Sequence, residues 1–123
     1  MKILIVDDIF TNRLLLAEVL RNLKLEFDQV ENGKQAIEAL EKEDYDLILM
    51  DIEMPVMNGL ETTKYIREKM PFPKNRTAII ALTAHNPQLF FDDFKDVGFN
   101  KLLTKPYNIQ KISGLIEIGR AHV

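Results

Sequence analysis

Short apolar segments of strand length alternate along this chain with longer segments of helical periodicity, and this alternation leaves few possible folds. Three nearly continuous apolar runs, Lys2–Val6, Asp46–Met50 and Thr77–Leu82, are typical of strands buried on both faces. Phe27–Glu31 alternates apolar and polar residues, which predicts a strand at a sheet edge, and Lys101–Thr104 predicts a short strand. The chain therefore has five predicted strands, of which the second is the least apolar.

Each predicted strand is followed by a segment whose apolar residues repeat at helical spacing. Strands joined through helices run parallel, their crossovers are right-handed, and the helices cover both faces of the sheet. The sequence thus predicts an α/β fold in which residues 1–123 form one domain with an open, doubly wound, five-stranded parallel sheet flanked by five helices. The expected helices are Thr11–Leu23, a helix within Asn32–Glu43, Gly59–Met70, Asn86–Gly98 and a last helix from about Ile109.

Composition narrows the function and the compartment. The formal net charge of −3 argues against nucleic acid as the main partner, because phosphate contacts need a basic surface. The chain has no cysteine, which excludes disulfides, thiolate zinc sites and cysteine nucleophiles and suits a reducing cytoplasm. No apolar run is long enough for a membrane span, and the aspartates after Val6 interrupt any signal sequence, so we expect Met1 to begin a mature cytoplasmic protein.

Polar residues follow four of the predicted strands. Asp7 and Asp8 come after the first strand, Asp51 after the third, Thr83 after the fourth and Lys105 after the fifth. The carboxyl ends of parallel strands meet at one edge of the sheet, where open α/β folds bind their ligands. Each residue alone has an ordinary explanation as a turn or cap residue, but their combined order predicts one shared site.

The chemistry of this predicted site follows from its charges. Three neighbouring carboxylates repel one another, and the single ammonium of Lys105 does not offset them. A hard divalent cation such as Mg²⁺ with oxygen ligands fits the remainder, whereas the lack of cysteine and of a histidine pair at ligand spacing argues against zinc. A carboxylate can also act as the nucleophile toward a phosphoryl group and form an aspartyl phosphate.

Four stretches of the chain together resemble the receiver domain of two-component response regulators, in the CheY-like superfamily. These stretches are "ILIVDD", "LILMDIEMPVMNG", "IIALTA" and "LLTKPY", and the resemblance covers essentially the whole chain. It implies a flavodoxin-like sheet with strand order 2-1-3-4-5. It also implies a phosphoprotein of signal transduction that catalyses only its own phosphorylation and dephosphorylation and is otherwise not an enzyme.

The resemblance assigns roles to the acidic residues. Asp51 is expected to accept a phosphoryl group from a phosphohistidine of a sensor histidine kinase or a histidine phosphotransfer protein. Asp8 and Asp51 would bind Mg²⁺ together with the backbone carbonyl of Glu53, and Asp7 would act largely through water.

The resemblance also assigns the switch. Lys105 and the hydroxyl of Thr83 would contact the phosphoryl oxygens, Ala84 would offer a backbone N–H, and the peptide bond before Pro106 is expected to be cis. The family carries an aromatic residue three positions before the lysine, but this chain has Leu102, which favours aliphatic repacking over rotation of a ring. The expected output surface is the fourth helix, fifth strand and fifth helix, which would bind an unknown downstream protein or a second copy of the chain.

Three other interpretations stay open. Asp51-x-Glu53 faintly resembles the Asp-x-Asp pair of haloacid-dehalogenase-like phosphatases, although that pair ends the first strand of those proteins and a cap segment usually covers their site. A receiver-like interaction module that is never phosphorylated is the second. A nucleotide-binding Rossmann protein is the third, but no glycine-rich phosphate loop follows the first strand.

Glu53 and His85 lie two residues after Asp51 and Thr83, so we predict that both border the path of the water that hydrolyses the aspartyl phosphate. Replacing both with alanine should change the decay rate of the phosphoryl-aspartate, followed by intact mass over time. An unchanged rate would leave His85 as an ordinary solvated loop residue and Glu53 without a role in hydrolysis.

Overall fold

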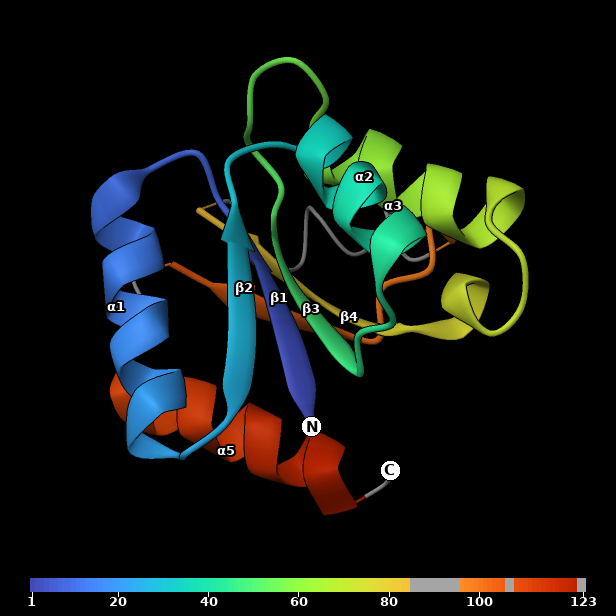
Figure 1. Ribbon diagram of the computed structural model, residues 1–123. Coiled ribbons are helices and arrows are strands. Elements are labelled where there is room, and N and C mark those ends of the chain that lie inside the picture. Colours follow the sequence, from blue (N-terminus) through green and yellow to red (C-terminus); the bar gives the residue numbers. More distant parts are fainter. Residues whose placement is uncertain (85–95, 106–107, 122–123) are drawn as a thin grey trace.

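The fold is a five-stranded parallel sheet in the order β2-β1-β3-β4-β5 (Figure 1), as the sequence predicts. The computed structural model of the chain describes residues 1–84, 96–105 and 108–121. The half-polar strand β2 lies at one edge of the sheet, where only one side needs to be paired. The elements are β1 Lys2–Val6, α1 Phe10–Asn22, β2 Glu26–Val30, α2 Gly33–Lys42, β3 Leu47–Asp51, α3 Gly59–Lys69, a 3₁₀ turn Lys74–Arg76, β4 Ala78–Thr83, β5 Lys101–Thr104 and α5 Ile109–Ala121.

Two strands extend further than the apolar pattern predicts. Asp51 and Thr83 are the last residues of β3 and β4, whereas the sequence pattern places them just after the strands. Asp51 pairs in register with Leu82, and the Ile52 N–H donates to the Leu82 carbonyl at 3.0 Å. The backbone ladder therefore continues past the point where the apolar residues stop.

Four of the five predicted helices fall within the described residues. The predicted fourth helix, Asn86–Gly98, lies mostly in residues 85–95, outside the described part of the chain, so it stays a prediction. Within residues 1–84, 96–105 and 108–121, no helix combines the length and the apolar character that a membrane span requires.

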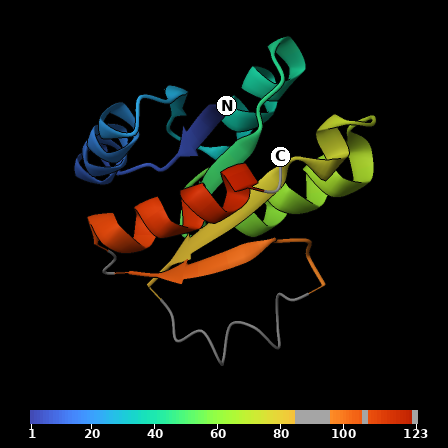
Figure 2. The ribbon, with the colours of Figure 1, turned by 90° about the horizontal axis from the view of Figure 1, so that it is seen from below.

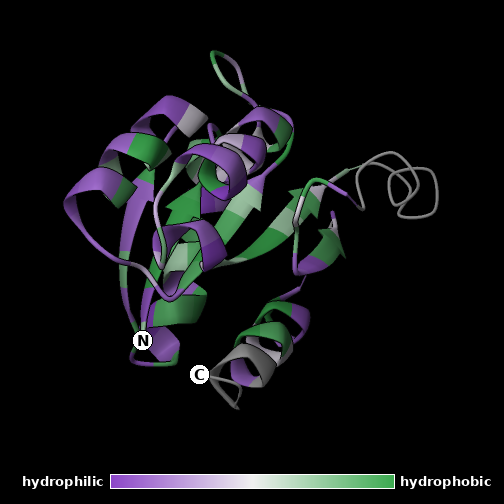
Figure 3. Ribbon diagram, turned by 90° about the vertical axis from the view of Figure 1, so that its right-hand side faces the viewer, coloured by the Kyte–Doolittle hydropathy of each residue, from purple (hydrophilic) through white to green (hydrophobic). Residues whose placement is uncertain are grey.

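Two apolar layers fill the faces of the sheet. Helices α1 and α5 pack on one face, and α2 and α3 pack on the other (Figure 1, Figure 2). Alternation along β1 sends Ile3 and Ile5 into the first layer and Leu4 and Val6 into the second. The central strands are mostly hydrophobic, and hydrophilic residues lie on the helices (Figure 3), so the strands gain their burial from both sides.

Local signals at the start of α3 place this helix against the end of β3. Asn58 and Glu61 form a reciprocal capping box, with the Asn58 side chain accepting from the Glu61 N–H at 2.9 Å. A Cβ atom at Gly59 would lie 2.4 Å from the Asp51 carbonyl oxygen, so only glycine allows this approach. The start of α3 therefore packs directly against the backbone at the end of β3, where the Gly59 N–H donates to the Ile52 carbonyl at 3.0 Å.

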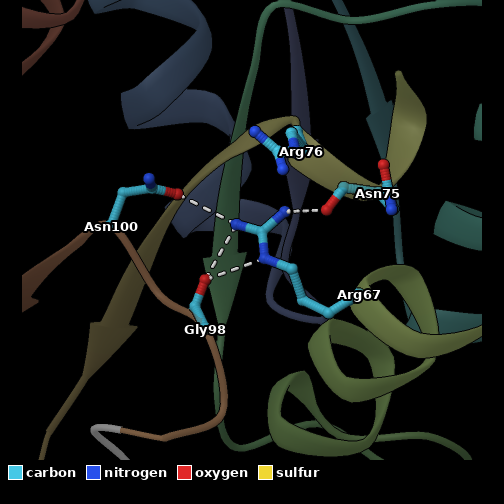
Figure 4. Close-up of a pocket in the computed structure, with 5 residues that line it drawn as sticks. All are labelled: Arg67, Asn75, Arg76, Gly98 and Asn100. Atoms are coloured by element: carbon cyan, nitrogen blue, oxygen red, sulfur yellow. Dashed lines mark hydrogen bonds between the residues drawn. The ribbon is translucent and has the colours of Figure 1, made fainter. Parts of the chain in front are cut away.

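Arg67 of α3 anchors the segment that leads into β5 (Figure 4). Its guanidinium donates to the Gly98 carbonyl at 3.0 and 2.8 Å and to the Asn100 side chain at 3.0 Å. It also donates to the carbonyls of Asn75 and Thr77, at 3.0 and 2.8 Å, just before β4. Arg67 therefore donates hydrogen bonds to three backbone carbonyls and holds the segments that lead into β4 and β5.

We predict that Arg67→Ala lowers the free energy of unfolding by about 2–4 kcal/mol, because it leaves part-buried carbonyls without donors. Urea denaturation measures the change. Arg76→Ala is the matched control, because Arg76 borders the same pocket but is exposed, with its Cζ 6.0 Å from the centre of the Phe72 ring. This variant should lower the free energy of unfolding by less than about 0.5 kcal/mol. Equal losses in the two variants would contradict the anchoring role.

Candidate functional site

Three aspartates meet at the carboxyl edge of the sheet. Asp7 and Asp8 directly follow β1, and Asp51 ends the neighbouring strand β3. One carboxylate oxygen from each lies within 4.8 Å of the others. Asp7 and Asp51 are buried and Asp8 is exposed, so the cluster has a closed inner side and an open outer side.

Each buried aspartate has one hydrogen-bonded oxygen and one oxygen without a partner in the described part of the chain. Asp7 Oδ1 accepts the Ile9 N–H at 2.9 Å, and Asp51 Oδ1 accepts from Lys105 Nζ at 3.0 Å and from the Glu53 N–H at 3.3 Å. The Oδ2 atoms of Asp7 and Asp51 are buried and have no hydrogen-bond partner among the described residues. Buried carboxylate oxygens require compensation, so these two atoms point to a bound cation or a further donor beyond the described residues.

The electrostatics of the cluster favour protonation when no cation is bound. Burial raises the pKa of Asp51 to about 7, with the charges of Asp7 and Glu53 adding to the rise and the hydrogen bond from Lys105 opposing it. Burial also raises the pKa of Asp7, against the lowering effect of the Ile9 N–H. The site therefore carries more negative charge than one lysine can offset.

Lys105 reaches this edge because β5 pairs with β4. The Lys105 N–H donates to the Thr83 carbonyl at 2.6 Å, directly after the last paired residues of the two strands. Its side chain is 19% exposed and forms the ion pair with Asp51 at 3.0 Å. The lysine thus lies beside the carboxylate that the sequence singled out as acceptor.

Thr83 faces the loop after β3. Its buried hydroxyl donates to Glu53 Oε1 at 3.0 Å, and the Glu53 side chain lies at the exposed rim of the site. Ala84, the next residue, is exposed. Leu102 pairs in register with Ala81 and packs, partly buried, against the small apolar cluster beneath the site.

Arg13 is a residue of this site that the sequence analysis did not single out. It is 9% exposed, and its Nη1 donates to the Asp7 carbonyl at 2.7 Å while its Nη2 lies 3.6 Å from Glu31. The sequence feature that could have identified Arg13 is its position on the apolar face of α1, three residues before Leu16. His85 and the peptide bond before Pro106 lie outside the described residues.

An acidic cluster with an adjacent lysine and threonine thus lies at the carboxyl edge of a doubly wound sheet, where open α/β folds bind their ligands. Residues 3–117 match the family described as "Response regulator receiver domain", so the chain belongs to the receiver family of two-component signalling.

The proteins that this chain resembles include long sensor kinases and a shorter response regulator. The chain is 40% identical over 106 residues to the autoinducer 2 sensor kinase/phosphatase LuxQ of Vibrio parahaemolyticus, covering 86% of this chain and 12% of that protein. It is 35% identical to the two-component response regulator 24 of Arabidopsis thaliana, covering 92% and 79%. This chain therefore spans a small part of the kinases that it matches and most of the plant regulator.

Solved receiver structures share the fold. The receiver domain of the sensor histidine kinase PA1611 from Pseudomonas aeruginosa is 32% identical, with a TM-score of 0.87 over 98% of this chain and 97% of that one. That structure has a magnesium ion coordinated in its active-site cleft. The chemotaxis regulator CheY4 of Vibrio cholerae is 28% identical, with a TM-score of 0.86 over 96% and 97%.

We predict that Asp51 destabilises the metal-free protein as pH rises. Its folded pKa of about 7 lies above the ordinary value near ~3.9, so its contribution to stability is full below pH ~4 and is lost as pH rises to about 7. In EDTA, the wild type should therefore lose on the order of a few kcal/mol relative to Asp51→Asn between pH 4.5 and 8, measured by urea denaturation. Mg²⁺ should restore most of this loss at pH 8, and parallel pH profiles for the two proteins would contradict the prediction.

Proposed function

We propose that this domain accepts a phosphoryl group on Asp51 from a phosphohistidine of a sensor histidine kinase or a histidine phosphotransfer protein. The observation that carries the proposal is the buried carboxylate of Asp51, with Oδ1 held by Lys105 at 3.0 Å and Oδ2 without a partner among the described residues. Membership of the receiver family supports the same residue, because Asp51 stands at the acceptor position of the matching motif.

The donor set at the site suits Mg²⁺. Two buried carboxylate oxygens need compensation, and hard divalent ions prefer oxygen ligands. Asp8 and Asp51 would hold the ion together with the backbone carbonyl of Glu53, and Asp7 would contact it through water. When bound, the ion neutralises carboxylate charge and screens the charge of the transferred phosphoryl group.

The chain's own residues supply the rest of the chemistry. An oxygen of deprotonated Asp51 forms the new P–O bond while the P–N bond of the phosphohistidine breaks, and the imidazole keeps the electron pair and takes up a proton. The Lys105 ammonium and the Thr83 hydroxyl donate to phosphoryl oxygens. The charge that develops there is thus met by donors already placed at the sheet edge.

Phosphorylation would then change the surface around β5. The modification adds about −1.5 to −2 charge and three acceptor oxygens, and Thr83 moves toward them. Leu102 packs beside Ala81 on the neighbouring strand, so it can repack into space that Thr83 leaves. The changed surface of β5, α5 and the predicted fourth helix would bind a downstream protein or a second copy of the chain.

We propose that the domain acts in the cytoplasm. The absence of cysteine suits a reducing cytoplasm, where the domain would act as a switch that modifies only itself and not as a catalyst for other substrates.

The decisive test is intact-mass measurement after incubation with a small phosphodonor such as acetyl phosphate. We expect one phosphoryl addition in the wild type with Mg²⁺, little without it, and none in Asp51→Asn. Asp44→Asn is the matched control, because Asp44 is an exposed acid just before the start of β3, at the other end of the strand from Asp51. This variant should take one phosphoryl group like the wild type. Labelling of Asp51→Asn, or failure of the wild type with every donor, would overturn the proposal, and rapid turnover of phosphate monoesters would favour the phosphatase interpretation.

A further inference from the structure

We propose that the Glu53 carboxylate holds the Thr83 hydroxyl in the unphosphorylated protein and thereby sets how readily the switch operates. The inference rests on the proposed function and adds a regulatory residue to the same site. Its basis is the hydrogen bond from Thr83 Oγ1 to Glu53 Oε1, at 3.0 Å.

The bond is built from a buried donor and a charged acceptor. Thr83 is fully buried at the end of β4, so its hydroxyl must find an acceptor inside the site. Glu53 reaches that hydroxyl from the loop after β3, and its own N–H lies 3.3 Å from Asp51 Oδ1. Bonds to a carboxylate are stronger than neutral ones, so this geometry stabilises the resting position of Thr83.

The hydroxyl cannot serve two acceptors at once. A threonine has a single O–H proton, so a bond from Thr83 to a phosphoryl oxygen requires that the bond to Glu53 breaks. The position of the Glu53 backbone ties its carboxylate to the neighbourhood of Asp51. A phosphoryl group on Asp51 would repel that carboxylate, and phosphorylation therefore supplies a new acceptor and weakens the old one.

The consequence is a competition that sets the resting equilibrium. Without a phosphoryl group, the Glu53 carboxylate favours the inactive position of Thr83 and opposes spontaneous switching. This effect concerns the position of Thr83 before any phosphate is present, so it is separate from the rate at which the aspartyl phosphate decays.

Beryllium fluoride, a stable mimic of a phosphoryl group on a carboxylate, provides the test. Its dissociation constant in Mg²⁺ is measured for the wild type, Glu53→Ala, Thr83→Val and the double variant. Removing Glu53 also removes a charge, and that part of the effect is present in the Thr83→Val background too. The proposal expects Glu53→Ala to tighten binding about tenfold more when Thr83 is present than in the Thr83→Val background.

Two conservative variants and one spectrum make the test specific. Thr83→Ser keeps the hydroxyl and should keep the coupling, while Glu53→Gln keeps an acceptor without charge and should fall between wild type and Glu53→Ala. In the absence of beryllium fluoride, the NMR signal of the Thr83 methyl group should shift in Glu53→Ala toward its position in the complex. Urea denaturation confirms that each variant is folded.

Equal effects of Glu53→Ala in the two backgrounds, or an unmoved Thr83 signal, would overturn the inference. If these occur while the wild type still takes one phosphoryl group on Asp51, this inference fails and the proposed function stands. If the wild type takes none, the proposed function fails and the inference falls with it.

Discussion

The ion pair between Lys105 and Asp51, 3.0 Å long and almost closed to solvent on the aspartate side, is the interaction on which the site depends. Two buried carboxylates next to one another are unfavourable, and burial raises the pKa of both. The lysine reduces this cost without removing it, since one oxygen of each buried acid lacks a partner among the described residues. The remaining excess of negative charge suits an edge of the sheet that binds a cation.

The fold serves mainly to bring these groups together. Parallel pairing of β1, β3, β4 and β5 delivers residues from four distant parts of the chain to one edge. Gly59 lets α3 start against the Asp51 carbonyl, and Arg67 of the same helix holds the segments before β4 and β5. The site is thus buried on its inner side, where the β strands end, and open to solvent on its rim, where Glu53 and Asp8 are exposed.

The contacts of Thr83 link the acidic site to strand β5. Its hydroxyl bonds to Glu53, its carbonyl accepts the Lys105 N–H, and its neighbours in the sheet include the Ala81–Leu102 pair. Receiver domains usually carry an aromatic residue at the position of Leu102. This chain has a smaller, aliphatic leucine there, and its side chain is already partly buried. We propose that the energetic balance of the switch in this chain depends more on polar contacts of Thr83 than on burial of a ring.

The sequence by itself determined that the sheet is parallel, that the half-polar β2 lies at its edge, and that Asp7, Asp8, Asp51, Thr83 and Lys105 come to one edge, because periodicity and parallel topology dictate where strands end. The full strand order came from the family resemblance. It missed the last residue of β3 and of β4, since backbone pairing does not stop where apolar residues do. Only the tertiary structure decided that Arg13 bonds the Asp7 carbonyl, that Arg67 serves Gly98, and that Thr83 donates to Glu53. The partners of Arg67 and Thr83 lie about thirty residues away in the chain, and all three contacts follow from distances that exist only once the backbone has folded.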